Sequence, residues 1–169
     1  MTDSRDGQTY KTVKIGDQVW MAQNLNYETA NSYCYNDNAT NCTKYGRLYT
    51  MTAAKSACPS GWHLPTQTEW NTLFTTVGGQ SVAGTKLKST SGWCENGNGT
   101  DAFSFSALPA GERNYDGSFI PEDSFASFWG FAEDDGYGAY CMHLSFSSDG
   151  VDLSFDGKDN GYSVRCLKD

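Results

Sequence analysis

The chain has 169 residues, a formal charge of −8 and 38% hydrophobic residues, which suits one folded domain over residues 1–169. Residues 1–100 hold 7 acidic and 8 basic side chains, whereas residues 101–169 hold 13 acidic and 4 basic ones. An acidic surface repels phosphate backbones and anionic lipids, so we expect no nucleic-acid partner. The chain has no apolar run long enough for a transmembrane helix, so we expect no direct membrane insertion.

The chain begins with a predicted β-hairpin. Residues 10–15 and 18–22 alternate between polar and apolar side chains on the two sides of Gly16-Asp17, which is a turn sequence. Residues 24–45 are polar and rich in Asn, Thr and Tyr, so we expect a long loop there.

Two short helices follow. Residues 51–58 predict the first, which Pro59 ends. Residues 66–77 predict the second, because Thr66 and Glu69 have the spacing of a capping box and the apolar residues after them recur with helical period. Residues 86–88 have the pattern of one more helical turn.

The remaining residues predict only strands and loops. The predicted strands cover residues 103–107, 113–120 with a bend at 116–117, 127–132, 138–146, 151–155 and 162–167. Helices therefore gather in the first half and strands in the second, which favours an α+β fold over alternating α/β units.

The cysteines indicate an oxidising compartment. The chain has six cysteines, no CxxC motif and only two histidines, so the spacing of a zinc finger is absent. An even number favours disulfides in an exported protein, and free buried thiols in the cytoplasm are the alternative. We interpret Met1 as an artificial start, so the missing leader does not argue for the cytoplasm. A Cys34–Cys42 bridge would stabilise the predicted loop by about 2–3 kcal/mol.

Five segments together resemble the Fibrobacter succinogenes major paralogous domain family. They are DGQTYKTVKIG (6–16), WMAQNLNY (20–27), CPSGWHLPT (58–66), FSALPAG (105–111) and SVRC (163–166). The resemblance runs in order along nearly the whole chain. It implies a C-type lectin-like fold in a surface or secreted protein, with two short helices packed on small antiparallel sheets and long loops.

The resemblance also implies disulfide pairings. In C-type lectin-like domains a cysteine at the end of the first helix bridges to the last strand, and Cys58 and Cys166 occupy those places here. Closing a loop of about 100 residues contributes at most about 4–5 kcal/mol. Cys94 and Cys141 remain, and we expect them to form a third bridge that ties the loop 92–100 to a late strand.

The predicted ligand-binding surface lies between about Asn114 and Asp156. Aromatic residues stand there beside Gly, Ser and Asp, a composition typical of paratopes. We expect about half of the rings in the core, Phe128, Trp129 and Phe131 among them, although core and site weigh equally for any single ring. The predicted ligand-binding residues are Tyr115, Phe119, Phe125, Asp134, Asp135, Tyr137, Tyr140, His143, Phe146, Phe155 and Asp156.

The sequence does not contain the calcium motifs of sugar-binding lectins. The strings nearest to Glu-Pro-Asn and Trp-Asn-Asp lie at 120–122 and 129–131 and lack the paired oxygens that calcium needs. Asp156, Asp159 and Asn160 could hold calcium, as could the acidic run 133–135, but turn chemistry explains both sets equally well. We therefore expect no metal and no cofactor.

No catalytic motif occurs, since GxSxG, HExxH, the P-loop and GxGxxG are all absent. Formylglycine-generating enzymes share the implied fold, so Cys94 and Cys141 could instead form an oxidase pair, which we weigh below a structural disulfide. Carboxylate pairs such as Glu112 with Asp116 do not predict a glycosidase, because sequence does not set their separation. We therefore expect no enzyme.

Residues 134–156 contain no Lys, Glu, Gln or Trp. C-type lectin-like domains also carry the variable surfaces made by diversity-generating retroelements, which produce this set of residues. A plain sheet surface of Ser, Gly and aromatic residues explains the same composition nearly as well.

We expect a non-catalytic, extracellular ligand-binding or adhesion module for a glycan or protein on another surface, as a monomeric domain of a larger protein. The alternative is a protein–protein assembly module of the cell envelope.

Overall fold

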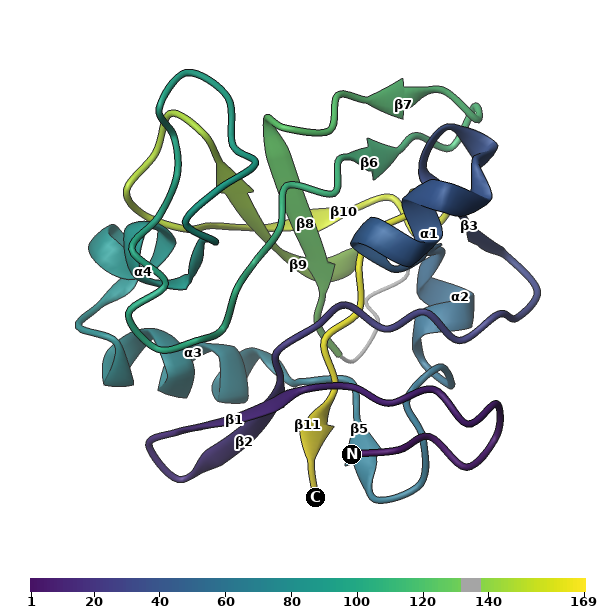
Figure 1. The fold of residues 1–169 in the computed structure, drawn as a ribbon, viewed down its shortest axis with the longest axis horizontal. Coiled ribbons are helices and arrows are strands. Elements are labelled where there is room, and N and C mark those ends of the chain that lie inside the picture. Colours follow the sequence, from purple (N-terminus) through teal and green to yellow (C-terminus); the bar gives the residue numbers. More distant parts are fainter. Residues whose placement is uncertain (132–137) are drawn as a thin grey trace.

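The computed structural model describes residues 1–131 and 138–169, and its elements are short (Figure 1). The strands are β1 (Thr12–Ile15), β2 (Gln18–Met21), β3 (Ser32–Tyr33), β4 (Leu48–Tyr49), β5 (Trp62–His63), β6 (Glu112–Arg113), β7 (Phe119–Ile120), β8 (Phe125–Trp129), β9 (Ala139–Ser145), β10 (Asp152–Asp156) and β11 (Leu167–Lys168). The helices are α1 (Ala39–Tyr45), α2 (Met51–Ala54), α3 (Gln67–Thr76) and α4 (Gln80–Leu87), with a 3-10 turn at Tyr35–Asp37.

One antiparallel sheet joins the two ends of the chain. Its strand order is β1-β2-β11-β5, and β1 and β2 form the predicted hairpin. The last strand, β11, lies between β2 and β5, because Leu167 pairs with both Trp20 and His63. Figure 1 shows both chain ends close to this sheet.

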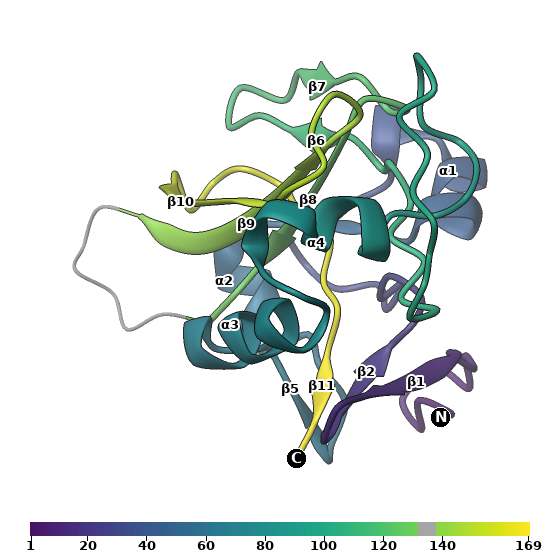
Figure 2. The same cartoon turned by 90° about the vertical axis from the view of Figure 1, so that its left-hand side faces the viewer.

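A second antiparallel sheet, with strand order β10-β9-β8, forms the other half of the fold. On β9, Tyr140, Met142 and Leu144 are buried in the same apolar cluster as residues of α3 and α4. Figure 2 shows α3 below this sheet and the β6–β7 hairpin above it. Helices α3 and α4 therefore cover one face of the sheet, whereas Trp129 and Cys141 on the opposite face share a second buried cluster with α2. We call the opposite face, to which Cys141 and His143 point, the outer face.

Helix α3 begins where the capping box predicts. The Thr66 hydroxyl accepts a hydrogen bond from the Glu69 backbone N–H, and the Glu69 carboxylate accepts one from the Thr66 backbone N–H. Trp70, Leu73 and Phe74 then bury one side of the helix. Trp70 contacts Trp20 at 4.7 Å between ring centroids, so this helix carries an aromatic part of the core.

Arg165, in the last motif of the chain, is fully buried. Its guanidinium donates hydrogen bonds to the Asn24 side-chain oxygen and to the backbone carbonyls of Met21, Phe105 and Ser106. Burial lowers the pKa of Arg165 to about 9, so the side chain is still charged at neutral pH. Because those acceptors are far apart in sequence, this side chain joins the N-terminal hairpin to the loop before β6.

The chain has more helix than the sequence predicts. Helix α1 lies within the predicted loop 24–45, where the Asn38 side chain caps it by accepting a bond from the Thr40 N–H. Helix α4 extends well beyond the predicted turn 86–88, because Ala83 and Leu87 pack into the core. Tertiary packing and capping overcome weak local propensity in both segments.

The predicted strand 103–107 does not form. Ser104 and Ser106 both have a positive φ, which strands do not allow. The Asp101 carboxylate explains the difference, because it accepts hydrogen bonds from the Ser106 N–H and hydroxyl and closes the segment into a loop.

Two of the three expected disulfides are present, Cys34–Cys42 and Cys58–Cys166. The third prediction is wrong, since Cys94 and Cys141 are both free. The Cys94 sulfur instead lies 3.5 Å from the Ser124 hydroxyl, whereas the Cys141 sulfur points to the outer face and lies 3.2 Å from His143. Each thiol thus has polar partners of its own.

The architecture is α+β, with short helices beside small antiparallel sheets, and it is consistent with a C-type lectin-like fold. Within the described ranges 1–131 and 138–169, no helix has the length and apolar character to cross a membrane.

Candidate functional site

The outer face of the β10-β9-β8 sheet gathers polar side chains from three strands. Cys141 and His143 share this face because side chains alternate along a strand. The register sets Ser127 opposite His143 and Ser154 opposite Cys141, and Asp156 follows Ser154 at the same spacing. We call these five residues the outer cluster.

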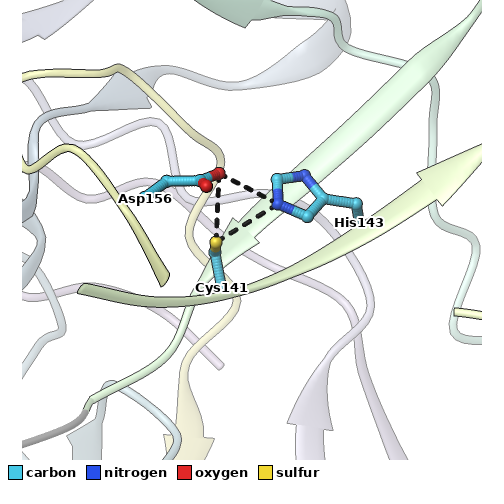
Figure 3. A group of neighbouring side chains, drawn as sticks. All are labelled: Cys141, His143 and Asp156. Atoms are coloured by element: carbon cyan, nitrogen blue, oxygen red, sulfur yellow. Dashed lines mark hydrogen bonds and ion pairs between the residues drawn. The ribbon is translucent and has the colours of Figure 1, made fainter. Parts of the chain in front are cut away.

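Three donor atoms of the outer cluster converge on one point (Figure 3). The Nε2 atom of His143 lies 3.0 Å from the Asp156 carboxylate and 3.2 Å from the Cys141 sulfur. The sulfur lies 3.3 Å from the same carboxylate oxygen. A thiol, an imidazole nitrogen and a carboxylate oxygen are therefore mutual neighbours.

The other ring nitrogen of His143 is held by a short polar relay. The Ser127 hydroxyl donates a hydrogen bond to the Glu112 carboxylate at 2.5 Å, so its oxygen is left to accept one. That oxygen lies 2.6 Å from His143 Nδ1. Nδ1 therefore carries a proton in both the neutral and the charged ring, and Nε2 faces Cys141 and Asp156.

Asp156 connects the outer cluster to the β6–β7 hairpin. The Tyr162 hydroxyl donates to the Asp156 carboxylate at 2.7 Å and accepts a bond from the Asn160 amide at 3.3 Å. The Asn160 side-chain oxygen accepts a bond from the Tyr115 backbone N–H at 3.0 Å. The side-chain oxygens of Asp156 and Asn160, two of the three residues considered for calcium, therefore already accept hydrogen bonds within the protein.

The charges of the cluster follow from this geometry. Burial lowers the pKa of His143, but interactions with Cys141 and Glu112 outweigh it and raise the pKa to about 10. Burial raises the pKa of the Cys141 thiol. Burial also favours protonated Asp156, yet its hydrogen bond from Tyr162 leaves its pKa below the usual value. In the metal-free protein an imidazolium thus lies between the carboxylates of Glu112 and Asp156.

Several predicted site residues are accessible. The Tyr115 side chain is 79% exposed on the turn of the β6–β7 hairpin, and Phe155 is 55% exposed on β10. Phe119, Phe125 and Phe146 are partly buried, and Phe119 packs against Tyr35. These rings do not form one patch, because Phe155 lies beside Tyr140 and so points away from the outer cluster.

Two predictions about aromatic residues are wrong. Tyr140 was predicted to bind ligand, but it is 1% exposed and belongs to the core cluster, because its position on β9 turns it towards α3. Phe131 was expected in the core, but it is 40% exposed, since it comes after the last residue of β8. Phe128 and Trp129 are buried as predicted.

Asp134, Asp135 and Tyr137, also predicted to bind ligand, lie outside the described residues, as does the acidic run 133–135. Among the described residues that were predicted to bind ligand, His143 and Asp156 come together in the outer cluster.

The sequence missed the residues that support His143 and Asp156. The spacing of Cys141 and His143 in a predicted strand indicates a shared face, but Cys141 was assigned to a disulfide. Glu112, Ser127 and Tyr162 reach the cluster through strand register and chain crossing. No local pattern in the sequence indicates such contacts.

A cleft of about 690 Å³ lies elsewhere, between the N-terminal hairpin, α1 and the loop 101–108. It contains none of the predicted ligand-binding residues. Arg165, its fully buried charged group, already donates to Asn24 and three backbone carbonyls. The outer cluster, whose His143 and Asp156 remain partly exposed, is the better candidate.

Comparison with known proteins places the chain in a family. No curated protein and no solved structure matches it. The model of the Fibrobacter succinogenes major domain matches residues 13–168, which is nearly the whole chain and includes every member of the outer cluster. The chain therefore belongs to the Fibrobacter succinogenes major domain family.

Proposed function

We propose that this domain is an extracellular, non-catalytic binding module whose ligand, a glycan or a protein on another surface, contacts the outer face beside the β6–β7 hairpin. The observation that carries the proposal is the continuous chain of contacts from the outer cluster through Tyr162 and Asn160 to the exposed Tyr115. Two disulfides support an oxidising, extracellular location.

The chemistry of this surface suits a polar ligand. The carboxylates of Glu112 and Asp156 accept hydrogen bonds from hydroxyl or amide groups, and both are partly exposed. Tyr115 offers a rigid ring that loses little entropy when it is covered. A sugar presents hydroxyl groups on its edge and C–H groups on its face, so it complements both.

The outer cluster does not present an accessible nucleophile. A nucleophile relay uses one nitrogen of histidine for the nucleophile and the other for an orienting acid. Cys141 lies at Nε2 of His143, and Ser127 and Glu112 lie on the Nδ1 side, but the Cys141 side chain is fully buried and burial raises the pKa of its thiol. Because a thiolate is the reactive form, these observations support a binding role over thiol catalysis.

A second candidate is a protein–protein assembly module. Strand β10 is at one edge of its sheet, and no strand of the described ranges pairs with its outer side. It carries Phe155, which is 55% exposed. An unpaired edge with an exposed ring is a template for strand addition by another protein.

A glycan array tests the first candidate with surface variants. We expect wild type to bind a defined group of glycans and Tyr115→Ala to lose at least tenfold in affinity. Val82→Ala, at another exposed apolar position, should bind as wild type does. Loss in Phe155→Lys with retention in Tyr115→Ala would assign the contact to the β10 edge.

A protein ligand is tested by a photo-crosslinking amino acid at position 115 or at position 155. A cross-link that forms from position 115 supports the outer face, and one that forms only from position 155 supports assembly. If wild type binds no glycan and neither position forms a cross-link, the proposed function is wrong.

A further inference from the structure

We propose that Cys141, His143 and Asp156 form a binding site for one divalent transition metal ion, with zinc as the best match. The proposal does not depend on ligand binding. Among the described residues, these three offer sulfur, nitrogen and oxygen donors that all lie within 4.8 Å of one another. The donors come from two neighbouring strands, β9 and β10, so they do not have the sequence spacing of a zinc finger.

The separations of the donor atoms are close to those of a tetrahedral zinc site. With Zn–S near 2.3 Å and Zn–N and Zn–O near 2.0–2.2 Å, neighbouring donors stand roughly 3.4–3.6 Å apart. In the structure the three separations are 3.0, 3.2 and 3.3 Å. Each pair must therefore open by only a few tenths of an ångström, which side-chain rotation on two strands can supply.

The donor types select the class of metal. Thiolate and imidazole suit zinc and its neighbours in the transition series, whereas calcium and magnesium prefer shells of oxygen ligands. Cys141 supplies sulfur and His143 supplies nitrogen, so two of the three donors disfavour the hard cations. Asp156 adds one negative charge, so a bound zinc ion with thiolate and carboxylate is neutral overall.

The orientation of His143 is an independent sign of a metal ligand. Metal-binding histidines commonly donate their second ring N–H to a fixed polar partner, which leaves the other nitrogen free to coordinate. Here Glu112 accepts from Ser127, and the Ser127 oxygen receives His143 Nδ1–H. In the neutral ring the lone pair of Nε2 then points to Cys141 and Asp156.

Asp156 is held in the same way. The Tyr162 hydroxyl donates to its Oδ2 atom, the atom that faces both His143 and Cys141. Ser154 donates to the other oxygen, Oδ1, at 3.2 Å. Both oxygens are therefore positioned by the protein, so metal binding does not have to order this carboxylate.

The fourth coordination position faces outwards. Cys141 is fully buried and forms the floor of the site, whereas the side chains of His143 and Asp156 are 21% and 28% exposed. The Ser154 hydroxyl borders the site, 3.1 Å from the sulfur and 2.9 Å from Nε2. Three protein ligands with one open position leave room for water or a ligand atom.

Metal titration of the full chain, free of any affinity tag and first treated with chelator, tests the proposal. We expect one equivalent of Zn²⁺ to bind and to raise the melting temperature. Co²⁺ should give the intense visible bands of tetrahedral cobalt and a thiolate-to-cobalt charge-transfer band. Cys141→Ser should abolish that charge-transfer band, and His143→Gln should weaken Zn²⁺ binding at least 100-fold.

Three further variants sharpen the test. Cys94→Ser removes the other free thiol and His63→Gln the other histidine, so both should bind Zn²⁺ as wild type does. Glu112→Gln should weaken binding about 10- to 100-fold, because it acts through Ser127 on the ring of His143. Asp156→Asn, at a partly exposed position, is the variant to use if Cys141→Ser does not fold.

Two results would overturn the proposal. The first is the absence of stoichiometric Zn²⁺ binding to the folded wild type, which would leave the outer cluster as a hydrogen-bonded network only. The second is full binding by Cys141→Ser and Asp156→Asn. Neither result bears on the glycan array, because Tyr115 does not contact the three donors.

Discussion

At the scale of single residues, His63 has a structural role, because both of its ring nitrogens face carboxylates of the same chain. Its Nδ1 lies 2.6 Å from the Asp169 carboxylate and its Nε2 lies 2.9 Å from the Glu69 carboxylate. Burial lowers the pKa of His63, but the hydrogen bonds to the two carboxylates outweigh it, so the net pKa is raised above 6.5. Both nitrogens face acids within the protein, so neither is left to act as a base.

A pH dependence follows from this raised pKa. A group whose pKa is higher in the folded state stabilises the fold fully below its unfolded pKa, and the effect is lost as pH rises through its folded pKa. We therefore expect His63→Gln to lower the free energy of unfolding at pH 5.5–6.0 and to have less effect at pH 8–9. Chemical denaturation of metal-free protein at both values measures this.

NMR titration gives a direct check, since the chain has two histidines. The ring signals of His63 should titrate above pH 6.5, and those of His143 in metal-free protein should titrate last, near pH 10. If His63 titrates at or below 6.5, its two ion pairs do not form in solution.

At the scale of elements, the capping box of α3 can be isolated by substitution. Thr66→Ala removes the hydroxyl that accepts the Glu69 N–H, and loss of such a cap costs about 0.5–2 kcal/mol. Thr68→Ala makes the same chemical change two residues later, at an exposed position, and serves as the control. Urea unfolding of the three proteins should show the loss in Thr66→Ala, and equal losses in both variants would contradict the cap.

Elements with a local cause could be predicted from the sequence. The hairpin at 10–22 follows from alternation around Gly16-Asp17, and α3 follows from Thr66 and Glu69. Elements that depend on distant partners could not. The segment 103–107 alternates like a strand, yet the Asp101 carboxylate folds it into a loop, and α4 exists because its apolar residues reach the core.

The candidate site divides in the same way. Alternation on β9 and β10 indicates that His143 and Asp156 point away from the core, as Met142 and Leu144 point into it. The third donor, Cys141, cannot be predicted in this way, because an even number of cysteines favours a bridge between Cys141 and Cys94. The pairing register of β9 with β10 brings Cys141, His143 and Asp156 together. This register depends on contacts between strands and cannot be inferred from the sequence of either strand alone.

At the scale of the whole molecule, two disulfides close loops of very different length. Cys34–Cys42 spans 8 residues around α1, whereas Cys58–Cys166 spans 108 residues and ties the segment after α2 to the segment before β11. The second bridge therefore constrains most of the unfolded chain, including all three strands of the β10-β9-β8 sheet.

The chain-entropy model predicts how much each bridge stabilises the folded protein from the length of the loop that it closes. Closing loops of 8 and 108 residues contributes about 2.5 and about 4.8 kcal/mol respectively, so the long bridge should matter more. Cys58→Ala/Cys166→Ala should lower the free energy of unfolding by about 2 kcal/mol more than Cys34→Ala/Cys42→Ala. Guanidinium unfolding with fitted midpoints and slopes measures both, and Cys94→Ser controls for the loss of a sulfur that is in no bridge.

The packing around each bridge also predicts a larger loss of stability when Cys58–Cys166 is removed. Cys166 is fully buried beside Leu167, whose strand joins the two ends of the chain, so loss of this bridge also loosens the sheet β1-β2-β11-β5. The Cys34–Cys42 bridge instead secures a surface segment capped by Asn38. A larger loss of stability from Cys34→Ala/Cys42→Ala would mean that α1 and the β3–β4 pair, and not the joined chain ends, limit the stability of the domain.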